Sequence, residues 1–143
     1  MSGFTLIELL VVISIIALLS AVVVPNFMGA RERGRDVSRK SDVRQIQKAM
    51  ELYKDTISPP SYPATAEYDA ISCDSSWSTA GGELLIKEFP CDPLDDSKYE
   101  YELNAADSLV YTLYACLENE SDPDGVVEAN CTDSGYKYEV TNP

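Results

Sequence analysis

The sequence contains no histidine, which removes the commonest general base of enzymes and every Cys/His zinc site. It also contains no Cys-x-x-Cys pair, so neither an all-cysteine zinc ribbon nor a dithiol redox site is expected. The Gly-x-Ser-x-Gly elbow and the phosphate-binding loop are missing as well. These absences predict a protein that is not an enzyme and has no catalytic residues.

Positive charge is scarce in the C-terminal part of the chain. Residues 56–143 contain three lysines and eighteen acids, a net charge of −15, whereas residues 31–55 contain eight bases and five acids. A surface this acidic repels a phosphate backbone, so we expect no nucleic acid binding by the C-terminal part.

Charge is almost absent from residues 4–24, where Glu8 is the only ionisable side chain. Apart from Thr5, Ser14 and Ser20 the other residues of this run are apolar, and as a helix it would be about 31 Å long. It is too long for the apolar core of a signal peptide and no Ala-x-Ala site follows it. We therefore predict a single membrane-spanning helix at 4–24.

The orientation of this helix is ambiguous from the residues alone. Four cysteines in the acidic part favour two disulfides and a location outside the cytoplasm. The alternative interpretation is a cytosolic domain with four reduced, buried cysteines. The bases that follow the apolar run favour the opposite orientation under the positive-inside rule.

The N-terminal residues carry a longer motif. The stretch Gly3-Phe4-Thr5-Leu6-Ile7-Glu8, followed by an apolar run that ends Val24-Pro25-Asn26-Phe27, resembles the type IV pilin and type II secretion pseudopilin superfamily. The Tyr62-Pro63 pair and Pro90-Cys91-Asp92-Pro93 resemble the major-subunit pattern more weakly.

This resemblance implies a role for each matching residue. Residues 1–3 would be a leader that a prepilin peptidase removes after Gly3, and Phe4 would then be N-methylated. Glu8 would be the assembly acid, with Thr5 beside it, and Pro25 the helix-bending proline. The resemblance also implies a head outside the cytoplasmic membrane, which agrees with the cysteines. The leader departs from the family pattern, because Met-Ser-Gly has no basic residue before the glycine.

Glu8 is costly inside lipid, so its carboxylate needs a partner or access to water. In a packed filament each Glu8 could pair with the N-terminal amine of a neighbouring subunit and fix the axial register, because a slipped charge is left unpaired. The alternative is a carboxylate that simply reaches the lipid headgroups. Pro25 and Gly29 likewise predict a helix that bends or unwinds near the membrane exit, or only a harmless kink.

The helix is predicted to continue from Phe4 to about Asp55, within an N-terminal helical segment of residues 4–57. An apolar stripe at helical spacing should pack against the head: Val37, Val43, Ile46, Met50, Tyr53 and Ile57. The bases on the other faces are expected to meet lipid phosphates or neighbouring acidic heads, or simply water.

The head is predicted to occupy residues 58–143. Residues 64–80 look irregular, and alternating apolar residues predict strands at 98–103, 109–118 and 136–140, separated by turns at 104–108 and 119–134. The expected fold is α+β, a long N-terminal helix packed on an antiparallel sheet of three to four strands. Three disulfide pairings are open; short loops favour Cys73–Cys91 and Cys116–Cys131.

One acidic loop could bind calcium. Asp122, Asp124 and Gly125 match part of an EF-hand, and Asp133 is a further candidate ligand, but Cys131 stands where the closing Glu belongs. A solvated acidic loop is the alternative, and no cofactor is required by anything in the sequence.

We thus expect a filament subunit that partners with itself, the prepilin peptidase, an assembly platform and, before assembly, the membrane. It would begin as a single-pass membrane protein and end in an extracellular pilus or in a periplasmic or cell-wall pseudopilus. A type IV pilus subunit is the first hypothesis, and a major pseudopilin of a type II secretion or DNA-uptake system is the second. A monomeric membrane-anchored binding domain is the alternative of another class.

Overall fold

The computed structural model describes residues 3–132 and 134–142, without the side chains of residues 22–26. The chain divides into two compact units, Met1–Gly34 and Arg35–Pro143, and the division falls inside the first helix. Each unit is described by itself.

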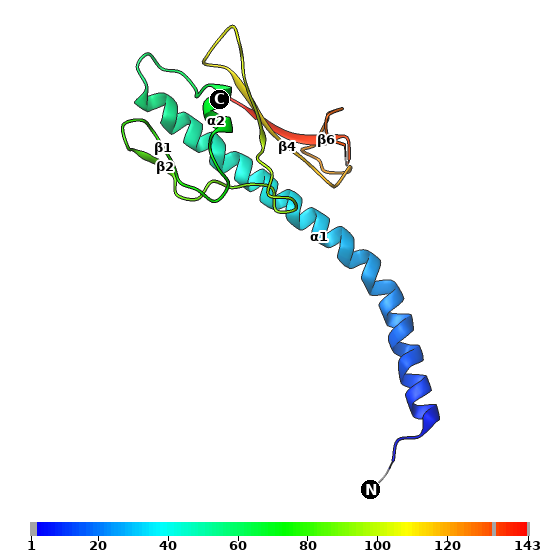
Figure 1. Ribbon diagram of the computed structural model, residues 1–143. Helices are drawn as coiled ribbons and strands as arrows, with labels where there is room; N and C mark the ends of the chain where they lie inside the picture. Colours follow the sequence, from blue (N-terminus) through cyan, green and yellow to red (C-terminus); the bar gives the residue numbers. More distant parts are fainter. Residues whose placement is uncertain (1–2, 133, 143) are drawn as a thin grey trace. The chain divides into compact units, whose positions relative to one another are not determined.

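Helix α1 runs over Leu6–Thr56, which agrees with the predicted long N-terminal helix (Figure 1). It ends just before Ser58-Pro59-Pro60, where proline rings disfavour a helical backbone in the preceding residues. The backbone is helical at Pro25 and Gly29. The predicted bend at Pro25 stays a prediction, because that side chain lies outside the described residues.

The main sheet of the head has four antiparallel strands in the order β3-β4-β6-β5. Their bounds are Glu100–Leu103 (β3), Tyr111–Cys116 (β4), Val126–Val127 (β5) and Tyr136–Thr141 (β6). Strands β3, β4 and β6 are the predicted three, with Tyr101 opposite Leu113 and Leu113 opposite Val140. The prediction of a simple turn over residues 119–134 is wrong, because β5 lies there and pairs with β6.

The prediction of an irregular segment at 64–80 is also wrong. It contains the short helix α2, Thr65–Asp69, and the strand β1, Trp77–Ser78. Strand β1 pairs with β2, Leu84–Ile86, in a separate two-stranded antiparallel sheet. Tyr68 and Trp77 anchor these elements because both side chains are almost fully buried. Elements this short have too few residues to show a periodic pattern in the sequence.

The second half of α1 packs on the sheet in Arg35–Pro143. Val43, Ile46 and Met50 of the helix are fully buried in one cluster with Tyr111 and Leu113 of β4. Strand β4 alternates buried and half-buried residues along its length, as expected for a strand with one face against a core. The core therefore joins this part of the helix and the sheet into one unit.

The predicted apolar stripe of the helix is wrong at Val37. Val37 is 65% exposed, whereas Asp36 and Arg39 are buried at 1% and 3% exposure. Positions 36, 39, 43, 46, 50 and 53 repeat at alternating spacings of three and four, so the face that meets the head begins with two charged residues. An apolar pattern alone could not have placed them there.

Tyrosines supply much of the core. Tyr68 stacks on Tyr101 with ring centroids 4.7 Å apart, and Tyr62 meets Tyr111 edge-on at 4.5 Å. Two of these hydroxyls reach backbone acceptors: Tyr68 donates to the carbonyl of Tyr99 at 2.9 Å, and Tyr101 to that of Pro63 at 2.7 Å. The buried hydroxyl of Tyr111 has no hydrogen-bond partner among the described residues. Large aromatic rings suit a small head, in which little purely aliphatic core can be built.

Two disulfides close the head, Cys73–Cys91 and Cys116–Cys131, with Cα atoms 5.7 and 5.4 Å apart. These are the two pairs that the loop lengths favoured. The second joins the end of β4 to the segment that leads into β6.

Candidate functional site

The first turn of α1 holds Glu8 in a reciprocal capping arrangement with Thr5. The backbone N–H of Thr5 donates to Glu8 Oε2 at 2.9 Å and its hydroxyl donates to the same oxygen at 2.7 Å. In return the backbone N–H of Glu8 donates to Thr5 Oγ1 at 3.3 Å. This is the Thr-x-x-Glu capping box, in which the residue before the helix and the third helical residue satisfy each other's free backbone donors. Sequence reasoning placed both residues in assembly but missed this contact, although the spacing could have shown it.

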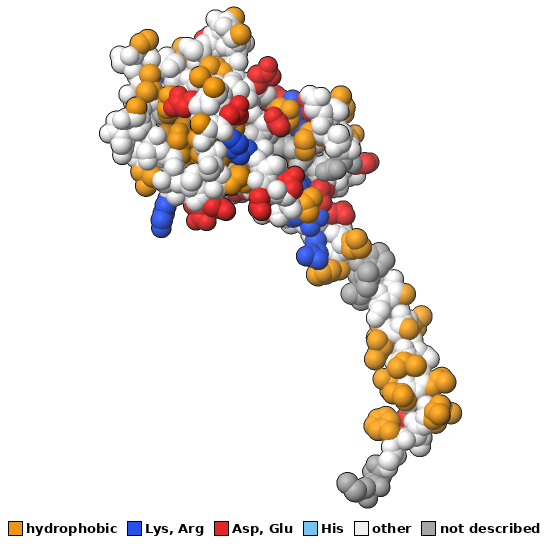
Figure 2. All heavy atoms as spheres, in the orientation of Figure 1, with side chains coloured by type: hydrophobic (Ala, Val, Ile, Leu, Met, Phe, Trp, Pro, Cys, Tyr) orange, Lys and Arg blue, Asp and Glu red, His pale blue; other side chains and the backbone are white. Residues whose placement is uncertain are grey.

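The apolar residues around Glu8 are exposed on every side of the helix. The exposed fraction of the residue is 84% for Phe4, 57% for Leu9 and 61% for Leu19. These side chains lie along the N-terminal part of the helix in Figure 2. A hollow of about 420 Å³ lies against Phe4, Ile7, Glu8, Val11 and Val12. A helix with apolar residues on all sides is normally covered by lipid or by other protein.

Within the part of the chain that the structure describes, no helix is long and apolar enough to cross a membrane.

In the second unit a charged network fixes the helix to the head. Asp36 accepts hydrogen bonds from the backbone N–H groups of Glu118 and Asn119, both at 2.9 Å, and from Arg39 Nη1 at 2.8 Å. Asp36 therefore satisfies the backbone that follows β4, while its charge is paired within the helix. Buried carboxylates require such partners.

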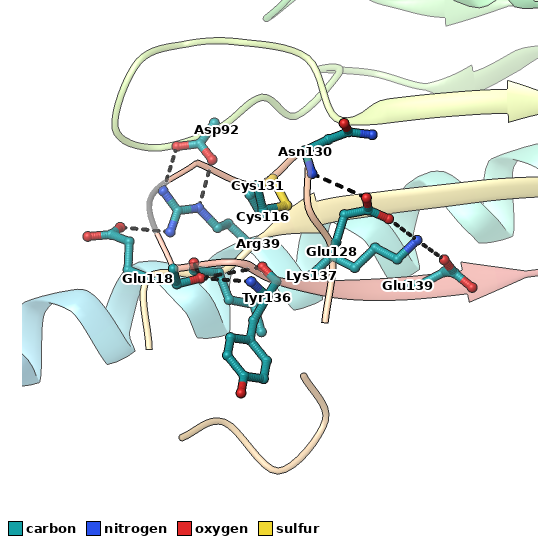
Figure 3. The surroundings of a disulfide bond; sticks show 12 residues. Arg39, Asp92, Cys116, Glu118, Glu128, Asn130, Cys131, Tyr136, Lys137 and Glu139 are labelled. Carbon is teal, nitrogen blue, oxygen red and sulfur yellow. Dashed lines mark hydrogen bonds and ion pairs between the residues drawn. A yellow bond between two sulfur atoms is a disulfide. The ribbon is translucent and has the colours of Figure 1, made fainter. Parts of the chain in front are cut away.

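Arg39 connects the helix to both disulfide-bonded segments (Figure 3). Its Nε donates to Asp92 Oδ2 at 2.7 Å and its Nη2 to Asp92 Oδ1 at 3.0 Å, next to Cys91. Its Nη1 donates to Glu118 Oε1 at 2.7 Å, two residues beyond Cys116. Burial by itself would lower the pKa of Arg39, but its hydrogen bonds to Asp92, Asp36 and Glu118 outweigh burial and raise it. The guanidinium thus stays charged at any physiological pH.

Glu118 also pairs with a second arginine of the helix. Arg35 Nε donates to Glu118 Oε1 at 2.7 Å, and Arg35 Nη2 to Glu118 Oε2 at 2.5 Å. The hydrogen bonds from Arg35, together with those from Arg39, hold the pKa of Glu118 below its usual value. The prediction that the bases of this helix meet lipid phosphates, neighbouring heads or water is wrong for Arg35 and Arg39, since both bind acids of their own head.

Lys40 lies between the two aspartates of the acidic loop. Its Nζ is 2.8 Å from Asp122 Oδ1 and 3.0 Å from Asp124 Oδ2. Burial alone would raise the pKa of Asp122, but the hydrogen bond from Lys40 reverses this and lowers it. Asp133, the third candidate calcium ligand, lies outside the described residues, and among those described no three His, Cys, Asp or Glu side chains gather as a metal site. The position that a cation would take between Asp122 and Asp124 is occupied by an ammonium group.

Comparison with known proteins places this chain in a family. Residues 1–24 match the family model of the prokaryotic N-terminal methylation motif. The chain is 32% identical over 108 residues to type II secretion system core protein G of Pseudomonas aeruginosa, covering 70% of this chain and 72% of that one. The chain belongs to the type IV pilin and pseudopilin superfamily. Its members among these relatives are structural subunits, and the chain is not an enzyme.

Two further relatives of this superfamily match more partially. The core protein G of Escherichia coli is 34% identical over 96 residues, covering 64% of this chain and 65% of that one. The type IV wide pilus major component of Thermus thermophilus is 48% identical over 52 residues, 36% of this chain and 40% of that one. The chain thus spans less than two thirds of either relative. No solved structure matches it.

The functional residues that the sequence did not predict are those that join the helix to the head. Asp36 and Arg39 of one helix turn meet Asp92 and Glu118, which come from two other, distant parts of the chain. The available signal was the spacing of Asp36 and Arg39, which continues the apolar stripe in phase. Asp92 and Glu118 show no comparable pattern, because the head contains many acids and nothing in their spacing distinguishes these two.

Proposed function

We propose that the chain is the structural subunit of a type IV pilus-like filament, assembled through the N-terminal part of α1. The observation that carries this proposal is an apolar helix surface exposed on all sides, with a single carboxylate fixed in its first turn. A soluble monomer would leave this surface in water at a large cost in free energy. Packing against lipid before assembly, and against other copies afterwards, covers it in both states.

Processing would make Glu8 useful for assembly. Cleavage after Gly3 and N-methylation at Phe4 would leave a positive amine four residues before Glu8. The capping box presents the Glu8 carboxylate at the same end of the helix as this amine, because both its bonds come from Thr5. The amine of a neighbouring copy could then pair with Glu8, and in an apolar surrounding such a pair would define one axial register.

The head is proposed to face away from the cytoplasm, where its two disulfides are stable. The acidic loop is proposed to need no metal, because the Lys40 ammonium already lies between Asp122 and Asp124 and pairs with both. The remaining partners would be the prepilin peptidase and the platform that extracts subunits from the membrane.

Two kinds of filament are candidates. The 108-residue match to core protein G favours a pseudopilus of a type II secretion system, whereas the Thermus thermophilus match favours a surface pilus over a shorter segment. Deleting the gene separates them: a pseudopilus subunit should be needed for protein secretion, and a pilus subunit for the filaments that shearing releases from cells.

The intact mass of protein purified from its source cells tests the processing step. The expected mass lacks Met1–Gly3 and contains one added methyl group, and an uncut chain would contradict the proposal. Assembly is tested by Glu8→Ala, which should abolish filaments while the precursor still accumulates in the membrane. Ser14→Ala is the matched control, since Ser14 bonds only the Leu10 carbonyl of its own helix and should leave filaments intact.

A further inference from the structure

A positively charged groove lies along the exposed side of α1 in the second unit. Its volume is about 550 Å³, and helix side chains line it, among them Ser41, Arg44 and Lys48, together with Asp124. Its charge does not come from Lys40, which is bound by Asp122 and Asp124. The charge comes from the next two bases along the helix.

Arg44 and Lys48 are exposed, and neither forms an ion pair with an acid that the structure describes. Arg44 Nε donates to the hydroxyl of Tyr138 at 2.8 Å, and this bond, together with the charge of Asp124 in the same groove, raises the pKa of Arg44. Lys48 makes no hydrogen bond or ion pair with any other residue that the structure describes. The two side chains are four residues apart on one helix face, so their Cα atoms are separated by about 6 Å along the axis.

A pair of acids with a similar spacing lies on the outer face of β3. Glu100 and Glu102 are exposed, whereas Tyr101 between them is buried in the core. Neither carboxylate bonds another of the described side chains. Residues two apart on a strand are separated by about 6.7 Å. Strand β3 is at the edge of the sheet, so this row of acids is open to an approaching surface.

Glu100 and Glu102 cannot serve Arg44 and Lys48 of their own chain. Tyr101 points into the cluster that includes Ile46 and Met50 of α1, so the neighbouring Glu100 and Glu102 point to the opposite side of the sheet. The basic groove and the acidic row are therefore different surfaces of one head. A contact between such surfaces is heterologous, and repeated from copy to copy it forms an open chain rather than a closed dimer.

We propose that the groove on α1 binds the outer face of β3 of a second copy of this chain, with Arg44 and Lys48 paired to Glu100 and Glu102. The inference rests on the proposed filament function and names the head contact within it. Heads of net charge −15 over residues 56–143 repel one another, and this contact brings an acidic row against a basic groove whose Arg44 and Lys48 form no ion pair with a described acid of their own chain. Exposed ion pairs of this kind contribute modestly to affinity but strongly to specificity and register.

Charge reversal and its rescue test the contact in cells that assemble the full chain. Lys48→Glu and Glu102→Lys are each expected to lower the amount of sheared or pelleted filament by at least about tenfold, since each puts two like charges in contact at every subunit along the filament. The double variant should restore it. Lys87→Glu and Glu88→Lys are matched controls, because both residues are exposed and unbonded to other described residues, and they should assemble normally.

A photoreactive benzophenone amino acid at Gln45, in the same groove, identifies the occupant. Crosslinked oligomers whose joined peptide contains residues 100–102 are the expected result. Crosslinking to lipid, or to a different segment of the neighbouring chain, would overturn the proposal. So would normal assembly of Lys48→Glu, or a double variant that stays as defective as the single ones.

Glu8→Ala in the same cells distinguishes a wrong head contact from a wrong filament function. If Glu8→Ala abolishes filaments and Lys48→Glu does not affect them, the head contact is wrong and the filament function stands. If Glu8→Ala assembles normally, the filament function itself is wrong.

Discussion

Arg39 of α1 and Asp92 of the head form a two-pronged ion pair, with Nε and Nη2 at 2.7 and 3.0 Å from the two carboxylate oxygens. The same guanidinium reaches Glu118, so one side chain joins the helix to the segments that follow Cys91 and Cys116. This contact therefore fixes the head to its helix at a point outside the apolar core.

Replacing Arg39 by Ala should strongly destabilise the head. Asp36 and Asp92 would keep their charges without the guanidinium, and breaking a buried pair from one side costs about 3–5 kcal/mol. Chemical denaturation of the full chain in detergent micelles, followed by circular dichroism, measures the change. Arg39→Lys should lose less, since it keeps the charge but not the fork geometry. Lys87→Ala, at an exposed position, should change stability little. An Arg39→Ala variant as stable as this control would show that the ion pairs of Arg39 do not stabilise the head.

Acid should weaken the attachment of helix to head. The pKa values of Glu118 and Asp122 are both lowered in the folded chain by their basic partners. Groups with depressed folded pKa values stabilise the protein above their ordinary pKa, here 4.5 and 3.8, and this stabilisation is lost as the pH falls through the folded values. The melting temperature should therefore drop as the pH is lowered from about 5 towards 3.

Two variants show which groups cause that drop. Glu118→Gln should flatten the pH dependence, whereas Glu100→Gln, at an exposed position of β3, should not. Asp42 works in the opposite direction: burial raises its pKa, so its protonation on acidification relieves a cost and offsets part of the loss. Asp42→Asn should therefore make the drop steeper.

Each disulfide should contribute to the stability of the head. The bonds close loops of 18 and 15 residues, and loops of this size are worth about 3 kcal/mol through the restricted unfolded chain. The paired replacements Cys73→Ser with Cys91→Ser, and Cys116→Ser with Cys131→Ser, isolate the two contributions. Denaturation midpoints measure them. A pair whose loss leaves the midpoint unchanged would show that the corresponding loop is held by other contacts, of which Arg39 is the first to test.

Calcium should leave the melting temperature of the wild-type chain unchanged, because Lys40 already lies between Asp122 and Asp124. Lys40→Gln should lower stability by leaving these aspartates facing each other, and it should make the chain respond to added calcium. Thermal unfolding with calcium or with a chelator measures both effects. A wild-type shift that the chelator reverses would show that a metal displaces the ammonium group. Lys48→Gln is the control on the same helix.

The sequence by itself determined the elements whose residues repeat or form a contiguous motif. The long helix, three of the four strands of the main sheet and the N-terminal methylation motif over residues 1–24 follow from local pattern, because a helix face, a strand face and a contiguous motif are all local in the chain. The loop lengths favoured the observed disulfide pairs for a similar reason.

The tertiary structure decided what distant residues do together. Val37 and Arg39 are close in sequence, yet only the packing of α1 on the head buries the arginine and exposes the valine. The strand β5 and the helix α2 are too short to show a period; β5 forms by pairing with β6, and α2 is anchored by its own Tyr68, which is buried in the core of the head. Eighteen acids follow residue 56, and their sequence does not reveal which of them will meet a base. That choice depends on the positions of Asp92, Glu118 and Asp122 in space, since pairing is a property of distance in the folded chain and not of order along it.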